Sequence, residues 1–213
     1  MQKLFMGYLG LLERTITIEW KEMNHYETSQ IFGFWHEDSF FMNLVLKKLS
    51  AKTGPVDVIV TADTRGDYIT AMVEKCGGHA LRVPDGYQSF SFLRKLVRNS
   101  YESTRSLAVA LDGPLGPRHE PKKLAFYLSS QAQEEFVGIF VTYSAALRLF
   151  WRWDHYAIPL PFSHMTVEVH NYGEVNKKQI PNLPFCAEIE YTAFGQKDEE
   201  KVQGRTAWRQ ITF

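Results

Sequence analysis

Two patterns of apolar residues alternate through most of the chain. Helical spacing is seen at Phe41, Leu44, Val45 and Leu49. Short, largely apolar runs of the kind found in buried strands occur at residues 31–35, 56–60, 79–83, 106–111 and 136–142. Because such strands alternate with helical segments, the pattern predicts βαβ units. The predicted fold class is therefore α/β, a single domain with a mixed, mainly parallel sheet flanked by helices.

Other segments complete the predicted order of elements. A β-branched alternation predicts a first strand at residues 15–20, and residues 165–169 alternate like an edge strand. Residues 196–205 are rich in charge and are interpreted as a solvated helix or loop. Further helices are predicted at residues 69–76, before a Gly-Gly stop, and at residues 92–97 and 122–132.

Residues 1–14 are predicted to form an amphipathic helix that precedes the main domain, residues 15–213. Leu4, Phe5, Tyr8 and Leu12 fall on one helical face. The segment lacks the basic start and small-residue cleavage site of a secretory signal, so we expect it to be retained. Its apolar face is expected either to pack on the domain or to lie in a membrane interface.

Charge and cysteine content narrow the possible classes of function. The 213 residues contain 24 Lys and Arg and 24 Asp and Glu, and this zero net charge gives no support for nucleic-acid binding. Two cysteines cannot supply a disulfide framework, which favours a reducing, cytoplasmic compartment, and their spacing from histidine does not suggest a metal site. Since no apolar run reaches about 18 residues, no membrane-spanning helix is expected.

Candidate catalytic groups follow the predicted strands, where ligands of open α/β sheets bind. His36 follows the strand at residues 31–35 and is a candidate general base, because imidazole titrates near neutral pH. Glu37 and Asp38 are close enough in sequence to orient it. The alternative interpretation is a structural histidine whose ring nitrogens are satisfied by hydrogen bonds.

The segment Asp112-Gly113-Pro114-Leu115-Gly116-Pro117-Arg118 predicts a rigid loop after a buried strand, because its Gly-Pro pairs exclude both helix and strand. Its glycines permit close approach of a ligand, and Arg118 and Lys122 offer positive charge for a phosphate or carboxylate. A purely structural turn is the alternative. Arg65 and Asp67 form a third candidate group, with a surface ion pair or helix-dipole contact as the alternative.

Several common phosphate and nucleophile motifs are missing from the sequence. There is no Gly-x-Gly-x-x-Gly after the first strands, no P-loop pattern and no Gly-x-Ser-x-Gly elbow. Dinucleotide binding, P-loop chemistry and serine hydrolysis therefore have no support.

In their order, these segments resemble the lysophospholipid acyltransferase-like superfamily of glycerolipid acyltransferase relatives. Within it, they are most similar to a bacterial branch with Trp-His and Asp-Gly-Pro-x-Gly-Pro-Arg motifs. The resemblance covers about residues 15–175 and rests on Trp35-His36, residues 61–67, the loop at residues 112–118, Trp153-Asp154 and residues 159–163.

The resemblance implies transfer of a fatty acyl group from a thioester donor, acyl-CoA or acyl-carrier protein, to a hydroxyl of a lysophospholipid or similar acceptor. His36 would act as the general base, and no bound cofactor is implied. Arg118, with the loop at Gly113 and Gly116, would hold an anionic group, and Arg65 is a second candidate for that role. The implied location is cytoplasmic, peripheral on the inner face of the cell membrane.

The chain departs from the family pattern at the acid partner of the histidine. The wider superfamily places Asp five positions after the histidine, where this chain has Phe41. Asp38, Glu37 or an acid from another segment such as Asp67 would have to substitute. In the second block, Gly66-Asp67 reverses the order common in the branch, which weakens the assignment of Asp67.

The departure leaves alternatives open. They are acylation of a non-glycerolipid or secondary-metabolite acceptor, a catalytically silent lipid-binding protein, and a phosphate-handling sugar enzyme. The aromatic stretch at residues 147–156 fits a lipid-handling surface, since Trp and Tyr favour apolar-polar boundaries. Burial of most of these rings in the core is the alternative interpretation.

Overall fold

A computed structural model gives the fold of the chain. Half of the predicted helix at residues 92–97 lies outside the residues that the structure describes, and residues 196–205 lie outside them entirely. The described residues are 2–21, 29–62, 64–83, 94, 96–98, 105–175, 178 and 180–184, with the side chains of Gln2 and Arg65 excepted.

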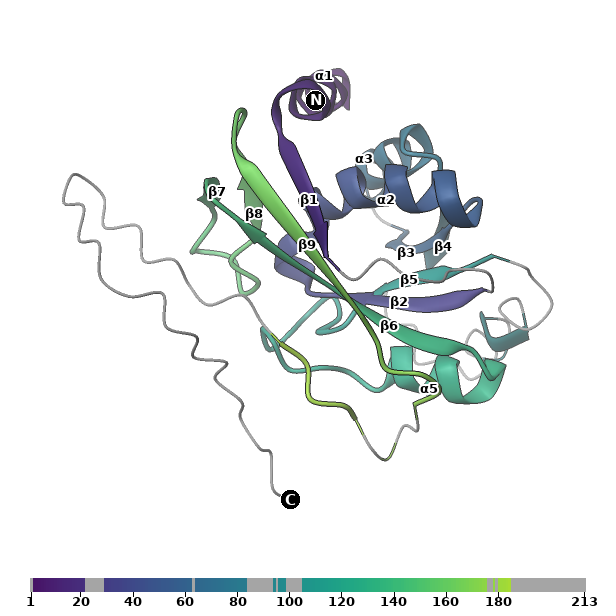
Figure 1. Cartoon of the computed structure of the whole chain (residues 1–213). Helices are drawn as coiled ribbons and strands as arrows, with labels where there is room; N and C mark the ends of the chain where they lie inside the picture. The colour runs from purple at the N-terminus through teal and green to yellow at the C-terminus, as the bar shows by residue number, and fades with distance from the viewer. Residues whose placement is uncertain are drawn as a thin grey trace, which may run out of the picture.

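Seven strands form one sheet in the order β1-β9-β6-β2-β5-β3-β4 (Figure 1). Only β9 and β6 pair in antiparallel fashion, and every other neighbouring pair is parallel. The prediction of an α/β domain with a mixed, mainly parallel sheet is confirmed. The strands are β1 (Thr17–Lys21), β2 (Gln30–Phe34), β3 (Asp57–Thr61), β4 (His79–Val83), β5 (Leu107–Ala110), β6 (Glu135–Tyr143) and β9 (His164–Asn171).

The prediction of an edge strand at residues 165–169 is wrong. Strand β9 lies between β1 and β6, so both of its edges are paired. Met165, Val167 and Val169 are buried, whereas the alternate residues are only partly covered. Alternation reports a difference between the two faces of a strand and says nothing about its two edges.

Helices cover both faces of the sheet (Figure 1). The helices α1 (Gln2–Thr15), α2 (Ser39–Thr53) and α3 (Thr64–Lys75) pack on one face through a core cluster that includes Phe32 and Phe34 of β2. Helix α5 (Leu124–Ala132) packs on the other face against Ile31 and Phe136. This arrangement gives the two-sided burial that continuous apolar strands require.

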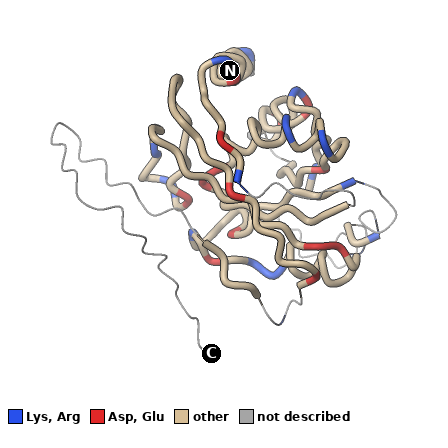
Figure 2. Tube along the Cα trace, in the orientation of Figure 1, with Lys and Arg blue, Asp and Glu red and all other residues tan. Residues whose placement is uncertain are grey.

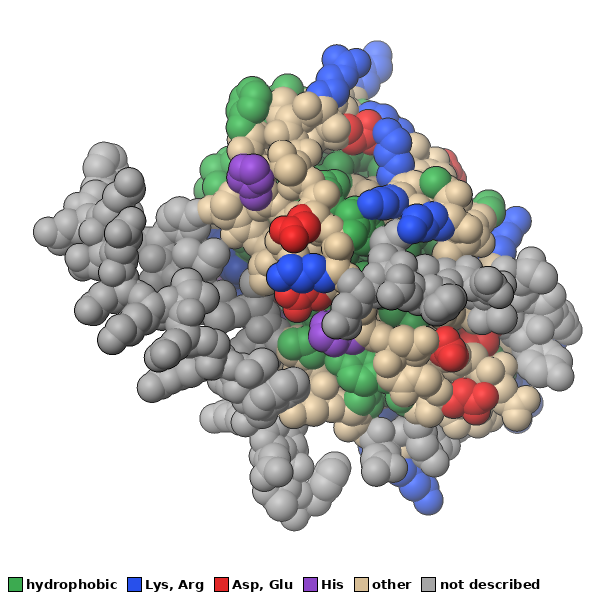
Figure 3. All heavy atoms as spheres, in the orientation of Figure 1, with side chains coloured by type: hydrophobic (Ala, Val, Ile, Leu, Met, Phe, Trp, Pro, Cys, Tyr) green, Lys and Arg blue, Asp and Glu red, His purple; other side chains and the backbone are tan. Residues whose placement is uncertain are grey.

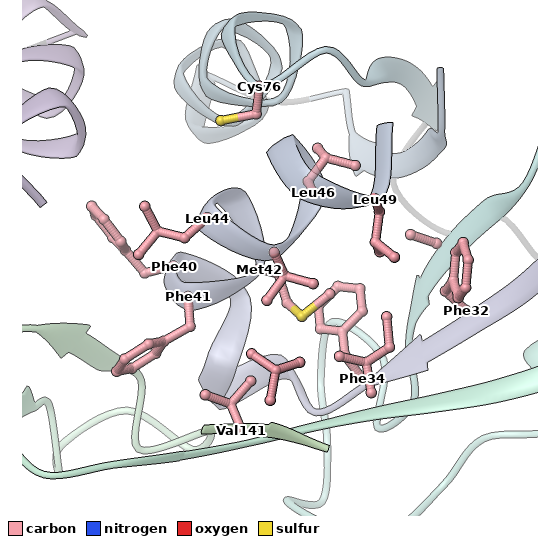
Figure 4. Packing of buried hydrophobic residues seen from close by; sticks show 14 of the residues in the cluster. Phe32, Phe34, Phe40, Phe41, Met42, Leu44, Leu46, Leu49, Cys76 and Val141 are labelled. Atoms are coloured by element: carbon pink, nitrogen blue, oxygen red, sulfur yellow. The ribbon is translucent and has the colours of Figure 1, made fainter. Parts of the chain in front are cut away.

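Helix α2 is buried around nearly its whole circumference. Seven consecutive residues, Phe40 through Leu46, are buried. Figure 4 shows Met42 and Leu49 pointing toward Phe34 and Phe32, with Cys76 of α3 on the opposite side of the helix. The ring of Phe41 stacks on Tyr143, with ring centroids 4.4 Å apart. Phe41 is therefore a core residue.

Helix α1 packs on the domain, as one of the two sequence interpretations proposed. Leu9 and Leu12 are completely buried, and Nζ of Lys75 in α3 donates a hydrogen bond to the carbonyl of Met6. Leu4, which was predicted to share the buried face, is 73% exposed.

The described helices include none that is both long and apolar enough to cross a bilayer. Acidic and basic residues are interspersed along the described chain (Figure 2), in keeping with its zero net charge. A separate two-stranded hairpin, β7 (Ala146–Arg148) and β8 (Ala157–Pro159), follows β6 and lies beside the sheet (Figure 1).

Candidate active site

His36 lies at the carboxyl edge of the sheet, two residues after the end of β2. It begins a short 3-10 turn, η1 (His36–Asp38), that leads into α2. The loop after β5 lies next to it, because the backbone N–H of Leu111 donates to the carbonyl of Phe34 at 2.7 Å. The His36 segment and the loop at residues 112–118 therefore meet where ligands of open α/β sheets bind.

The imidazole of His36 is paired with Asp154. Nδ1 of His36 lies 2.8 Å from Oδ2 of Asp154. The carboxylate is completely buried, whereas the histidine side chain is 26% exposed. A carboxylate on Nδ1 fixes the tautomer that carries hydrogen there, which leaves Nε2 as the basic nitrogen. Nε2 has no hydrogen-bond partner among the described residues.

Arg152 holds Asp154 in its ionised form. Its guanidinium donates two hydrogen bonds to the carboxylate, from Nε at 2.8 Å and from Nη2 at 2.7 Å. The backbone N–H of Tyr156 donates a third, at 3.3 Å. Burial alone would raise the pKa of Asp154, but the hydrogen bonds from Arg152 and His36 outweigh it and hold the pKa well below its usual value.

The β7–β8 hairpin brings Asp154 to the histidine. Asp154 lies in the connection between the two strands, and β8 packs against α2 and η1. Trp153-Asp154 is among the segments on which the sequence resemblance rests, but no role was predicted for Asp154. Arg152 two positions earlier was the available signal, since a buried carboxylate needs a cation.

Asp38, the acid partner expected from the sequence, does not take that position. Its carboxyl group is buried and has no hydrogen bond to the His36 ring, and its Oδ1 has no partner among the described atoms. Burial, with the negative charge of Glu37, raises the pKa of Asp38 well above its ordinary value. The correction is physical: residues two apart in a helical turn do not face each other.

Arg118 binds Glu37 instead of facing an open anion site. Its Nε donates to Oε2 of the completely buried Glu37 at 2.8 Å, and its Nη2 lies 2.6 Å from the same oxygen. His119 and Arg148 also contact this carboxylate, at 2.9 and 3.3 Å. Burial would raise the pKa of Glu37, but its contacts with His119 and Arg118 lower it. Arg118 therefore has a structural contact with Glu37, and its expected role with an anionic group of the substrate stays a prediction.

Asp112 joins the two loops of the site. Its Oδ1 accepts the backbone N–H of His36 at 2.9 Å, and its Oδ2 accepts that of His119 at 3.2 Å. Burial raises the pKa of Asp112, and the two backbone hydrogen bonds oppose that rise. Asp112 thus positions the backbone of the candidate base without contacting its ring.

The Gly-Pro loop shapes the space in front of His36. Gly113 and Pro114 line the adjacent cavity. Gly116 has φ 68°, and a Cβ atom there would lie 2.5 Å from the Trp153 ring. Trp153 in turn packs 5.2 Å from the His36 ring, centroid to centroid.

Two other predicted site residues, Lys122 and Asp67, are not among the described residues that line the cavity. Lys122 is exposed and caps the loop through its backbone N–H, which donates to the carbonyl of Leu111 at 2.7 Å. Asp67 is exposed and forms an ion pair with Arg82 at 2.8 Å, which is the alternative that the sequence left open. Arg65 lies at the start of α3, but its side chain is outside the description.

A mainly apolar cavity of about 390 Å³ extends from His36 between the sheet edge and helices α1, α2 and α3. Its size is within the range of small-molecule sites. Asp and Glu are absent from its described lining. The polar side chains that line it are His36, Ser39, Asn43, Thr61, Tyr68, Arg152 and Tyr156, and its apolar walls include Phe5, Phe34, Phe40, Ile59, Val60, Met72, Val83, Val109, Leu124, Trp153 and Ile158.

Large exposed apolar side chains lie next in sequence to residues that line this cavity. Trp151 is 80% exposed and Phe150 is 65% exposed, and they lie between the lining residues Leu149 and Arg152. Leu115, beside the lining residue Pro114, is 87% exposed. Figure 3 shows apolar side chains at the surface near the β7–β8 hairpin. The aromatic stretch is thus divided between a lining part and an exposed part.

A His-Asp pair beside an apolar cavity can remove a proton from a hydroxyl of a lipid-like molecule. Ser39 is not placed as a nucleophile, because its hydroxyl donates to the carbonyl of His36 at 2.6 Å and has no hydrogen bond with the imidazole.

No family model matches this chain, and no curated protein matches it either.

Proposed function

We propose that this protein is an acyltransferase that moves a fatty acyl group from a thioester to a hydroxyl of a lipid-like acceptor. The single observation that carries the proposal is the His36–Asp154 pair at one end of an apolar cavity. The cavity suits a hydrocarbon chain, and the imidazole suits removal of a hydroxyl proton. The order of sequence motifs supports the same chemistry.

In the proposed reaction, Nε2 of His36 accepts the proton of the acceptor hydroxyl as its oxygen attacks the thioester carbonyl. The carbon–sulfur bond then breaks, so that the acyl group is now an ester on the acceptor oxygen. The thiolate that leaves accepts the proton from the imidazolium of His36. No acyl-enzyme forms, in keeping with the orientation of Ser39 away from the imidazole. The donor is acyl-CoA or an acylated carrier protein.

Asp154 stabilises the positive charge that develops on the imidazole during the transfer. It remains a carboxylate because Arg152 lowers its pKa, and its burial strengthens its interaction with the ring. Asp154 thereby supplies the acid partner that the family pattern places on the helix.

The acceptor class proposed first is a lysophospholipid or a similar lipid alcohol. Exposed Phe150, Trp151 and Leu115 support a peripheral position on the inner face of the cell membrane, where the cavity would receive its substrates from the lipid. Trp151 suits the interface between headgroups and acyl chains, because its ring combines a large apolar surface with a polar N–H.

The test measures release of free thiol from a panel of acyl-CoAs, with and without a lysolipid extract, and identifies the products by mass spectrometry. Wild-type protein should show acceptor-dependent release, and His36→Ala should abolish it. His79→Ala is the matched control, because His79 also pairs through Nδ1 with an aspartate, Asp57 at 3.0 Å, but does not line the cavity.

The same experiment separates the rival functions. Acylated products of a non-glycerolipid alcohol would support acyl transfer but would change the proposed class of acceptor. Saturable lipid binding without thiol release, from acyl-CoA or acyl-carrier protein, would favour a catalytically silent lipid-binding protein.

A further inference from the structure

One polar side chain within the apolar cavity has no part in the proton transfer. Asn43 lines the cavity from helix α2 and is only 7% exposed. It is one of the seven consecutive buried residues of α2, and the other six are apolar. Asparagine is unfavourable in the middle of a helix and costly to bury unless its polar atoms are paired.

The orientation of the Asn43 amide is fixed by its neighbours. Its Nδ2 donates to the backbone carbonyls of Ser39 at 3.1 Å and Phe40 at 3.2 Å. The reverse orientation would place the amide oxygen against two carbonyl oxygens, so the NH₂ group must face the helix. The amide oxygen, Oδ1, accepts no hydrogen bond from any residue that the structure describes.

Asn43 continues a line of polar groups that begins at the candidate base. His36, Ser39 and Asn43 all line the cavity, and their spacing of three and four residues puts them on one face of the η1–α2 segment. At about 1.5 Å of rise per residue, Asn43 lies roughly 10 Å beyond His36 along the helix. A substrate chain that reacts at His36 and runs along α2 would pass Oδ1 of Asn43.

We propose that Asn43 determines specificity by accepting a hydrogen bond from a hydroxyl group carried on the hydrocarbon chain of the substrate. This inference rests on the proposed acyl transfer, because it assumes that the cavity holds a chain whose reacting end lies at His36. Oδ1 is an acceptor only, so its partner must be a donor. A cationic donor would meet no acidic side chain in the described lining, whereas a hydroxyl is neutral and small.

The hydroxyl has two possible sources, the acyl chain of the donor and a chain of the acceptor. In either case the hydroxyl lies well along the chain and not beside the reacting carbonyl, since Asn43 is about two helical turns from His36. A chain without the hydroxyl would leave Oδ1 of Asn43 buried and unpaired, which is the basis of discrimination.

The first test is a binding measurement that needs no turnover. Dodecanoic acid and its monohydroxy isomers, with the hydroxyl at each carbon in turn, compete with a fluorescent fatty acid for the wild-type protein. We expect at least one mid-chain or terminal isomer to bind about fivefold or more tightly than the unsubstituted acid. Asn43→Leu should abolish this preference, and Met72→Leu, an apolar exchange in the same cavity, should retain it.

Folding of the variant is checked by its melting temperature, and Asn43→Met serves as a second variant if Asn43→Leu does not fold. Equal binding of all isomers by the wild type would overturn the inference. A preference that survives both substitutions would overturn it as well.

Two turnover arms identify the source of the hydroxyl. The first pairs hydroxyacyl-CoAs with a plain lysophospholipid, and the second pairs a plain acyl-CoA with a lysophospholipid whose chain is hydroxylated. Preference in one arm assigns the hydroxyl to that substrate, whereas turnover without preference in either arm overturns the assignment to a substrate. Selective binding without any thiol release would refute acyl transfer while leaving the Asn43 preference established.

Discussion

Nδ1 of His36 and Oδ2 of Asp154 lie 2.8 Å apart, although 118 positions separate the two residues in the chain. The β7–β8 hairpin supplies the aspartate, and Arg152 keeps it ionised. The sequence resemblance led us to expect the acid on the helix after the histidine. Here that position holds Phe41, which is part of the core.

The contact between Gly116 and Trp153 gives the first prediction. Gly116→Ala should lower the free energy of unfolding by about 2–4 kcal/mol, because a Cβ atom at φ 68° adds backbone strain and overlaps the Trp153 ring. Activity should fall as well, since Trp153 packs on His36. Urea unfolding and thiol release measure the two effects.

Gly173→Ala is the matched control for this prediction. Gly173 has φ 66°, and nothing lies within 4 Å of its added Cβ. Its cost should be only the backbone strain of about 1–2 kcal/mol. Equal losses at the two glycines would contradict the packing role of Gly116.

Much of the fold could be predicted from the sequence, because β2, β5 and β6 are buried on both faces and therefore read as continuous apolar runs. Strand β9 was wrongly predicted to be an edge strand. Its alternating pattern shows that one face is more buried than the other, but it does not show whether other strands pair on both sides. The position of His36 could be predicted, because it directly follows an apolar strand. Its partner could not be predicted, because Asp154 is 118 positions away in the chain and no fixed sequence distance links a histidine to an acid on a distant hairpin.

The loop at residues 112–118 lies beside the cavity, as the sequence predicted, and the expected role of Arg118 with a substrate anion stays a prediction. Gly113 and Pro114 do line the cavity, but Arg118 is directed to Glu37. A sequence cannot show which of several acids and cations will pair once they are buried. The pairing depends on desolvation, which only the folded arrangement determines.

Arg118→Lys should destabilise the protein without weakening substrate binding. Lysine cannot reproduce the contacts that the guanidinium makes with buried Glu37, so we expect a loss of about 2 kcal/mol in urea unfolding. The KM values for donor and acceptor should remain within about twofold of wild type, because Arg118 contacts Glu37 and is not among the described residues that line the cavity. A twofold change in KM corresponds to well under 1 kcal/mol. A tenfold rise in KM with normal stability would instead assign Arg118 to an anionic group of the substrate.

Arg152→Ala should show a pH-dependent loss of stability. The folded-state pKa of Asp154 is lowered, so its stabilisation is present above the unfolded pKa of about 3.9 and is lost as pH falls through the folded pKa. The variant should therefore lose about 3 kcal/mol at pH 7, with the deficit shrinking below about pH 4.

The control for Arg152 is Lys21→Ala, which removes an exposed ion pair with Glu168. Its effect should be too small to resolve at either pH. A deficit in Arg152→Ala that stays constant from pH 7 to pH 3 would contradict the role of Arg152 in holding an ionised Asp154.

Trp151→Ser combined with Phe150→Ser should reduce co-sedimentation with anionic liposomes at low salt. Both rings are exposed beside the cavity, and burying each aromatic ring in the interface contributes on the order of 1–3 kcal/mol. Leu11→Ser, at an exposed position of α1, is the control and should change binding little. Unchanged liposome binding in the double variant would contradict the proposal that the β7–β8 hairpin contacts the membrane.

The central claim is that Asp154, and not Asp38, makes His36 a general base for acyl transfer. Its most direct test compares acceptor-dependent thiol release for Asp154→Asn and Asp38→Asn at the same acyl-CoA and lysolipid concentrations. We expect Asp154→Asn to lower kcat roughly 100-fold or more, because general base catalysis contributes that much. Asp38→Asn should stay within about threefold of wild type, because the described contacts of the His36 ring include Asp154 and not Asp38. Full activity in Asp154→Asn, or loss of activity only in Asp38→Asn, would contradict the account.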